Sequence, residues 1–119
     1  MTPAEARELV AQALESGEYK QGHGWLCAYG RYCCLGVATE VFMKHNPGII
    51  ETETPNVRMY KCGSAHEDRR LLEIVRRWLG FGDKSGFFNK DSLAALNDIG
   101  TSFTEIAKLF RNPPEGLLE

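Results

Sequence analysis

The longest run of apolar and small side chains lies near the middle of the chain. Between residues 32 and 41 only Thr39 and Glu40 are polar, and a helical pattern continues to residue 46. A helix that is apolar around nearly its whole circumference has to be covered on more than one side. We therefore expect a central buried helix at residues 32–46, with the other elements packed around it.

The first residues carry the pattern of a helix N-terminus. Thr2 suits the N-cap, Pro3 the first helical position, and Glu5 the position that closes a capping box. The helix should run to about Ser16 and end at Gly17. Its apolar stripe, which should pack on the core, consists of Ala6, Val10, Ala13 and Leu14.

A second capping box lies at residues 64–67, with the sequence Ser-Ala-His-Glu. It predicts a helix that ends at Gly80 in a left-handed cap, followed by an apolar contact from Phe81. The inner face of this helix would carry Leu71, Leu72, Val75, Trp78 and Leu79.

Two further helices are predicted near the C-terminus. Asp91 or Ser92 can cap a short helix that ends at Gly100. A third capping box at residues 102–105 should open the last helix. Residues 112–119 contain two consecutive prolines, which stop that helix, and are expected to form a loose tail.

Three short runs have the composition of strands. They lie at residues 25–29, 49–53 and 57–62, and a loop with three glycines at residues 17–24 precedes the first. They could form a small three-stranded antiparallel sheet. The pattern as a whole predicts an α+β fold of about five helices around the central one.

Length and composition narrow the class of protein. The chain has 119 residues, 43% of them hydrophobic and 25% charged, as expected for one globular domain spanning residues 1–119. Its 14 basic and 16 acidic residues give a net charge of -2, which does not provide the broad basic surface that bulk nucleic-acid binding needs. No run of 18 apolar residues predicts a membrane span, and the acidic N-terminus is unlike a secretory signal. We expect a cytoplasmic protein.

The four cysteines do not suggest a disulfide framework or a metal site. Neighbouring Cys33 and Cys34 would point about 100° apart on a helix, and in a reducing cytosol buried thiols are expected, although the sequence leaves their redox state open. Zinc ligands would have to come from these side chains and three histidines, but there is no Cys-x-x-Cys pair. We therefore expect no metal and no cofactor. The residues considered are Cys27, Cys33, Cys34, Cys62, His23, His45 and His66.

Aromatic and basic side chains gather between the glycine-rich loop and the central helix. Aromatic faces can stack a base, and Lys20 or Arg31 can meet a phosphate near the N-H groups of the helix N-terminus. This cluster predicts a site for a nucleotide-type ligand. The alternative is that the rings pack in the core while the charges lie in water. The cluster contains Tyr19, Lys20, Gln21, His23, Trp25, Tyr29, Arg31 and Tyr32.

Four arginines mark the helix predicted after Ser64. Arg69, Arg70, Arg76 and Arg77 recur at spacings of seven, with Glu73 between them. They can form a solvated face of ion pairs, each worth a few tenths of a kcal/mol. They can also form an anion-binding patch, in which case Arg69 and Arg76 would belong to the same ligand site.

A cysteine nucleophile is a further hypothesis. Cys34, or Cys33, lies near a predicted helix N-terminus, which can lower the pKa of a thiol. The sequence around it loosely resembles the nucleophile helix of papain-like peptidases, with His66 as base and Asn97 or Asp98 as the orienting group. The bland alternative for Asn97 and Asp98 is a structural role at the turn before Gly100.

Two strings carry a wider resemblance. YCCLGV at residues 32–37 and LAALNDIGTSFTEIA at residues 93–107, together with SGEYKQ at 16–21 and WLGF at 78–81, resemble a family of small uncharacterised proteins common in phages and prophages. The family has no established catalytic residues to carry over. The resemblance implies an accessory phage protein, and such proteins often block host defence.

These observations lead to three hypotheses. The first is a non-enzymatic binding protein, in the host cytoplasm, that sequesters a cyclic dinucleotide or an ADP-ribose derivative at a site shared in a homodimer. The second is an inhibitor that docks an exposed helix face on a host protein. The third is a papain-like cysteine hydrolase.

Overall fold

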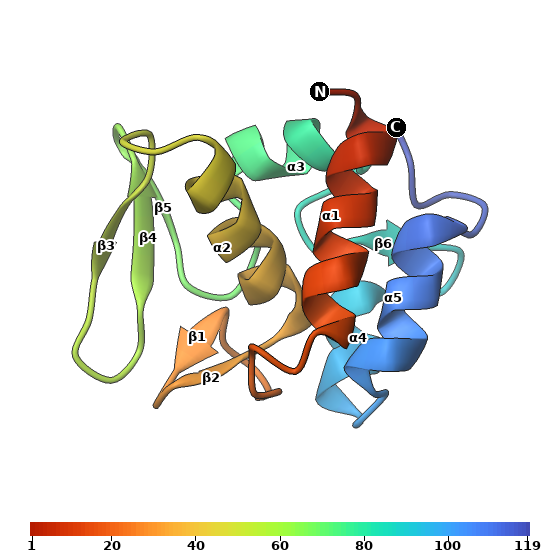
Figure 1. Cartoon of the computed structure of the whole chain (residues 1–119), viewed down its shortest axis with the longest axis horizontal. Helices are drawn as coiled ribbons and strands as arrows, with labels where there is room; N and C mark the ends of the chain where they lie inside the picture. The colour runs from red at the N-terminus through yellow and green to blue at the C-terminus, as the bar shows by residue number, and fades with distance from the viewer.

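Five helices and seven short strands alternate along the computed structural model, which describes residues 1–119 (Figure 1). The helices are α1 (Pro3–Glu15), α2 (Cys34–His45), α3 (Glu73–Leu79), α4 (Leu93–Asp98) and α5 (Phe103–Arg111). The strands are β1 (Cys27–Ala28), β2 (Arg31–Tyr32), β3 (Glu51–Glu53), β4 (Met59–Cys62), β5 (Ala65–Glu67), β6 (Phe87–Phe88) and β7 (Asp91–Ser92). The predicted α+β class, with five helices and small antiparallel sheets, is confirmed. No helix has the length and apolar character needed to cross a membrane.

Helix α2 forms the centre of the core, as its apolar circumference predicted. Its residues from Cys34 to Phe42 are buried, apart from half-buried Glu40. The helix begins two residues later than predicted, because Tyr32 belongs to β2 and Cys33 is an extended N-cap whose thiol accepts a hydrogen bond from the Gly36 backbone. Any Cβ at Gly36 would lie 1.7 Å from the carbonyl oxygen of Leu26, so only glycine permits this close approach.

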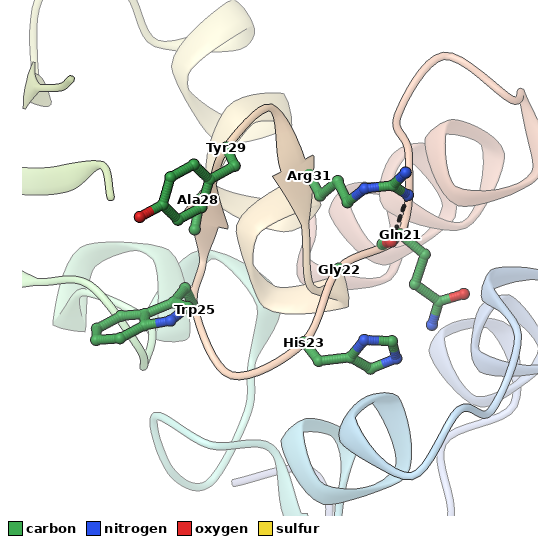
Figure 2. Close-up of a pocket in the computed structure, with 7 residues that line it drawn as sticks. All are labelled: Gln21, Gly22, His23, Trp25, Ala28, Tyr29 and Arg31. Carbon is green, nitrogen blue, oxygen red and sulfur yellow. Dashed lines mark hydrogen bonds between the residues drawn. The ribbon is translucent and has the colours of Figure 1, made fainter. Parts of the chain in front are cut away.

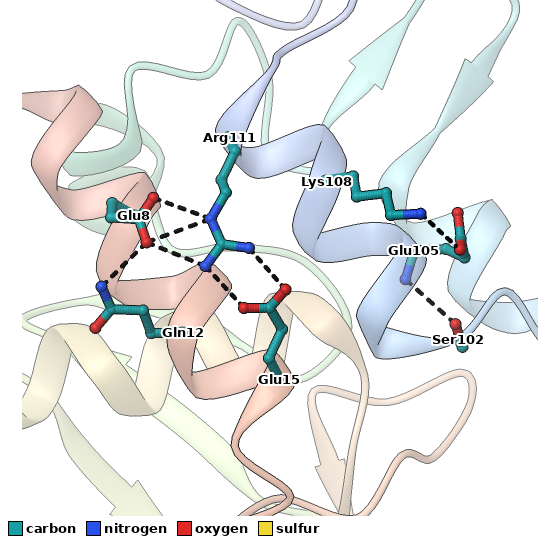
Figure 3. A network of polar contacts seen from close by, with 7 residues as sticks. All are labelled: Glu8, Gln12, Glu15, Ser102, Glu105, Lys108 and Arg111. Atoms are coloured by element: carbon teal, nitrogen blue, oxygen red, sulfur yellow. Dashed lines mark hydrogen bonds and ion pairs between the residues drawn. The ribbon is translucent and has the colours of Figure 1, made fainter.

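The capping box of α1 is formed as predicted. Thr2 Oγ1 accepts a hydrogen bond from the Glu5 amide at 3.1 Å, and the Glu5 carboxylate accepts one from the Thr2 amide at 2.8 Å. α1 packs along α5, and Figure 3 shows Arg111 of α5 reaching Glu8 and Glu15 of α1. The two terminal helices are therefore joined by both apolar packing and ion pairs.

The second predicted capping box is wrong. Residues 65–67 form strand β5, which pairs antiparallel with β4 after a turn at Gly63, where φ is +61°. α3 begins only at Glu73, with Leu72 as an N-cap that makes no side-chain hydrogen bond. The pairing with β4 accounts for the difference, because backbone hydrogen bonds to a neighbouring strand replace the helix that local capping residues would favour. The predicted left-handed cap at Gly80 is confirmed, with φ at +75°.

The segment at residues 25–29 is not a strand of the larger sheet as predicted, although Ala28 forms an antiparallel bridge with Val57 in the run predicted at residues 57–62. It contributes β1, which pairs with β2 across a tight turn, while the three-stranded sheet consists of β3, β4 and β5. Tyr29 and Gly30 both have positive φ, at 53° and 75°, which is the pattern of a type I′ hairpin turn. The chain therefore turns back at once. Backbone hydrogen bonds from Tyr29 to Asn56 and from Arg58 to Cys27 tie this hairpin to the segment before β4.

The C-terminal segment, residues 112–119, is not a loose tail. Leu117 is fully buried, its carbonyl accepts a hydrogen bond from the Gly82 amide, and the Glu119 amide donates to the Gly80 carbonyl. The expectation rested on two prolines that end the helix, but ending a helix does not prevent the following residues from packing. The predicted caps at Ser92 and Ser102 are present, and they open α4 and α5.

Candidate functional site

A groove of about 430 Å³ lies between the loop at residues 21–25 and the β1–β2 hairpin (Figure 2). Its lining residues are Gln21, Gly22, His23, Trp25, Ala28, Tyr29 and Arg31. All but Gly22 and Ala28 belong to the aromatic and basic cluster recognised in the sequence. The groove therefore brings part of that cluster together.

Asn97 holds the loop in place from the opposite side. Its side chain is fully buried, and its Nδ2 donates to the Gly22 carbonyl at 2.8 Å. Its Oδ1 accepts hydrogen bonds from the Cys34 amide at 3.2 Å and from Gln21 Nε2 at 3.0 Å. One side chain of α4 thus joins the groove loop to the first turn of α2. Asn97 therefore has a structural role, as the alternative hypothesis predicted. Its hydrogen bonds extend beyond its own turn to the groove loop and to α2.

Two neighbouring contacts complete this anchor. Asp98 accepts a hydrogen bond from the Gly24 amide at 2.8 Å. The Gln21 amide nitrogen also donates to the Thr101 carbonyl at 2.7 Å. Both hydrogen bonds fix the Gln21 side chain through its nitrogen, so Gln21 forms part of the wall of the groove.

Trp25 forms one end of the groove and is half-buried. The guanidinium carbon of Arg69 lies 4.2 Å from the centre of the Trp25 ring system, which is the geometry of a cation–π contact. Arg69 lies in the loop before α3 and not on the predicted helix. The structure nevertheless brings this arginine to the side of the groove.

Tyr29 stands at the tip of the hairpin with 75% of its surface exposed. Its φ of 53° places a bulky residue in the left-handed region, which costs of order 1 kcal/mol or more. Neither the exposed ring nor the backbone conformation benefits from packing in the core. An exposed aromatic ring in a strained turn, in a groove that Arg31 and His23 also line, is a typical feature of a binding site.

The other members of the sequence cluster lie outside the groove. Tyr19 and Tyr32 pack edge to face, with ring centroids 5.1 Å apart, and both contact the hydrophobic core. Lys20 is exposed, and its backbone carbonyl accepts a hydrogen bond from the Tyr32 amide. The rings of Tyr19 and Tyr32 therefore pack in the core, which is the structural alternative to a role in ligand binding.

The predicted arginine face does not form. Arg76 is buried, forms an ion pair with Glu73 at 2.7 Å, and donates to the Phe81 carbonyl, so it is unable to reach the groove ligand as predicted. Arg77 also pairs with Glu73. Arg70 lies in the loop before the helix and pairs with Glu67 at the end of β5. The seven-residue spacing does not place the four arginines on one helix face, because the helix begins after Arg70.

The two neighbouring cysteines are not placed as nucleophiles. Burial raises the pKa of Cys33 to about 11 and that of Cys34 well above its ordinary value. The Cys34 thiol is fully buried and donates to the Leu93 carbonyl. His66 lies in β5 opposite Lys61, so the proposed arrangement of Cys34, His66 and Asn97 is not assembled. All four cysteines are free thiols.

A buried polar cluster beneath the hairpin was missed in the sequence. Glu40 of α2 accepts hydrogen bonds from the Tyr60 hydroxyl at 2.6 Å and from Arg58 at 2.9 Å. Burial and the nearby Glu40 carboxylate raise the pKa of Tyr60. Because the Arg58 amide also donates to the Cys27 carbonyl, the cluster fixes the hairpin on α2. The one signal in the sequence is a single carboxylate, Glu40, within an apolar helix.

A comparison with models of protein families gives a match over most of the chain. The model of the family described as Domain of unknown function (DUF8296) matches residues 3–113, which include the groove, the hairpin and Asn97. No curated protein and no solved structure matches the chain.

Proposed function

The chain belongs to this family of domains of unknown function, and we propose from its own residues that it binds a small nucleotide-type ligand in the groove. The observation that carries the proposal is the meeting of Trp25 and Tyr29 with Arg31 and His23 in one hollow of about 430 Å³. That volume lies within the range of roughly 300–1,000 Å³ typical of small-molecule sites.

The chemistry of these side chains suits a base joined to a phosphate. Stacking a base on an aromatic side chain is worth about 1–3 kcal/mol. Arg31 is exposed, and its guanidinium makes only a long hydrogen bond of 3.5 Å to the Gln21 carbonyl (Figure 2). It therefore remains available for a bidentate contact to phosphate oxygens.

The proposed activity is capture of the ligand and its release unchanged. The buried thiols of Cys33 and Cys34 are outside the groove lining, so the proposal assigns them no reaction. The ligands proposed are a cyclic dinucleotide or an ADP-ribose derivative.

The biological setting is also a proposal. The resemblance of YCCLGV and LNDIGTSFTEIA to phage and prophage proteins supports an accessory protein that removes a defence signal in the host cytoplasm. A homodimer belongs to this proposal, because a second copy could cover the open side of the groove.

The proposal is tested by thermal unfolding with a panel of cyclic dinucleotides, ADP-ribose, ADP and NAD. A ligand at one hundred times its dissociation constant should stabilise the fold by about 2.7 kcal/mol, and raise the unfolding midpoint by several degrees. The variant Arg31→Gln should lose most of this shift. Arg77→Gln is the matched control, because Arg77 is exposed and pairs only with Glu73. A panel without any shift would contradict the proposal.

A second candidate function is inhibition of a host protein by direct docking. Ile99 has 79% of its surface exposed, and it lies next to Asp98, which bonds to the groove loop at Gly24. The exposed Ile99 side chain would lie in the contact surface. Ile99→Ser should weaken such docking and leave nucleotide binding unchanged, so the variant separates the two functions.

A further inference from the structure

Arg69 and Trp25 are held together by two contacts, one between side chains and one between backbones. The guanidinium carbon of Arg69 lies 4.2 Å from the centre of the Trp25 ring system. One residue away on each segment, the amide of fully buried Leu26 donates a hydrogen bond to the Asp68 carbonyl at 2.8 Å. The backbone therefore fixes the two segments side by side, and the Arg69 side chain starts from a fixed point beside the ring.

No carboxylate compensates the charge of Arg69. Its neighbour Arg70 pairs with Glu67 at 3.0 Å, and Lys84 lies 3.6 Å from the same Glu67 oxygen. Four further arginines of the chain also form ion pairs with glutamates. Arg69 is exposed and forms neither an ion pair nor a hydrogen bond. It therefore places a free positive charge against the Trp25 ring.

The groove that Trp25 lines has no acidic side chain in its lining. Its seven lining residues include the cation Arg31 but no Asp or Glu, and Asp98, which binds the Gly24 amide, is not among them. Each of the other four hollows in the surface has at least one glutamate in its lining. In a chain with a net charge of -2, the groove is thus a local site that favours an anion.

We infer that Arg69 is a positioning residue of the groove, which holds the Trp25 ring in place for stacking and adds positive charge for an anionic ligand. This inference rests on the proposed function and adds to it a residue from outside the lining. Arg69 can act on the ligand through space, because charges within about 8 Å of each other are only partly screened at physiological ionic strength. It serves ADP-ribose and cyclic dinucleotides alike, since both are anionic.

Isothermal titration of the full chain with the nucleotides of the thermal unfolding panel tests the role of Arg69 in binding. Arg69→Gln should weaken binding roughly tenfold, because the contact to Trp25 and a nearby positive charge are both lost. Arg70→Gln is the matched control, since this neighbouring arginine is also exposed and its removal changes the net charge equally. Arg69→Lys keeps the charge and should retain most of the affinity.

The outcomes of the titration separate the inference from the proposed function. Unchanged affinity in Arg69→Gln, or an equal loss in Arg70→Gln, would overturn the inference and leave the proposed function standing. Equal losses in Arg69→Lys and Arg69→Gln would overturn the role given to the charge. If no nucleotide of the panel binds the natural chain, the proposed function itself fails, and the binding role of Arg69 fails with it.

Fluorescence tests the position of the Trp25 ring without any ligand. Trp78→Phe leaves Trp25 as the single tryptophan of the chain, and a phenyl ring can keep the packing of residue 78 against Phe42. In this background Arg69→Gln should make the emission of Trp25 easier to quench with acrylamide, because the guanidinium no longer covers the ring. Arg70→Gln should leave the quenching unchanged. Equal quenching in the two variants would overturn the positioning role, whatever the titration shows.

Discussion

One residue of the groove, Tyr29, is both exposed to solvent and held in an unfavourable backbone conformation. Tyr29 occupies the first central position of the hairpin turn, where φ is 53° and where Asn is strongly preferred in type I′ turns. Asn tolerates the left-handed region because its short side chain can bond locally. The natural tyrosine is therefore a residue that the turn itself does not favour.

The change Tyr29→Asn should stabilise the fold and remove ligand binding. We expect a gain of about 1 kcal/mol in the free energy of unfolding, measured by urea denaturation, because the strain at this position is relieved. The affinity for the nucleotide ligand should fall at least tenfold. Tyr29→Ala is the control, since it also removes the ring but keeps a residue that disfavours positive φ. A loss of stability in Tyr29→Asn would show that the ring contributes to the fold.

Asn97 is a residue whose removal leaves two buried backbone groups, the Gly22 carbonyl and the Cys34 amide, without their partner. In Asn97→Ala the Gly22 carbonyl, the Cys34 amide and the Gln21 amide lose hydrogen bonds inside the protein. Each unsatisfied buried group costs roughly 1–3 kcal/mol, so we expect a loss of about 3 kcal/mol in urea denaturation. Asn112→Ala, at an exposed position after α5, should cost much less. Similar losses in both variants would contradict the role given to Asn97.

At the scale of elements, the seam between α1 and α5 combines packing with charge. Arg111 donates to Glu8 at 3.1 Å and to Glu15 at 2.7 Å, and these hydrogen bonds lower the pKa of both carboxyls (Figure 3). The buried residues of α5 supply the apolar part of the contact. The ion pairs lie near the surface, so salt should weaken them.

The lowered pKa values of the two carboxyls that Arg111 binds determine the direction in which pH changes the stability of the fold. A carboxyl whose pKa is lower in the folded state adds stability at pH values above its unfolded pKa of about 4.3, and this stability is lost as the pH falls through the folded value. The stability advantage of the natural chain over Arg111→Met should therefore be full at pH 7 and shrink below about pH 4.3. Urea denaturation at several pH values measures it. Lys108→Met, which removes a pair within α5, is the control. An advantage that grows in acid would contradict the assignment.

Elements defined by local signals could be predicted, and those defined by distant partners could not. Thr2, Ser92 and Ser102 cap helices through neighbours within the same turn, so the sequence contained the whole signal. Residues 64–67 carry an equally good capping pattern but pair with β4, and a strand partner is not visible in a local pattern. The same error moved Arg69 and Arg70 onto a helix that begins after them.

The groove residues divide in the same way, into those placed by the local sequence and those placed by distant contacts. His23, Trp25 and Arg31 lie within nine residues, and a single loop and hairpin bring them together, so the cluster could be recognised from the sequence. Arg76 was assigned wrongly because its position depends on where α3 begins. The structural partner Asn97 lies more than 60 residues from Cys34 in sequence, a separation that no local pattern could connect.

At the scale of the whole molecule, one buried side chain connects three regions that are distant in sequence. Asn97 ties the groove loop to both α2 and α4, and the neighbouring Asp98 adds a bond to Gly24. The loop therefore shares the stability of the core, and it has little freedom left to lose when a ligand arrives. A preorganised site of this kind spends little binding free energy on ordering itself. Groove variants that leave Asn97 intact should accordingly alter mainly how long the ligand stays bound, and change its rate of association much less.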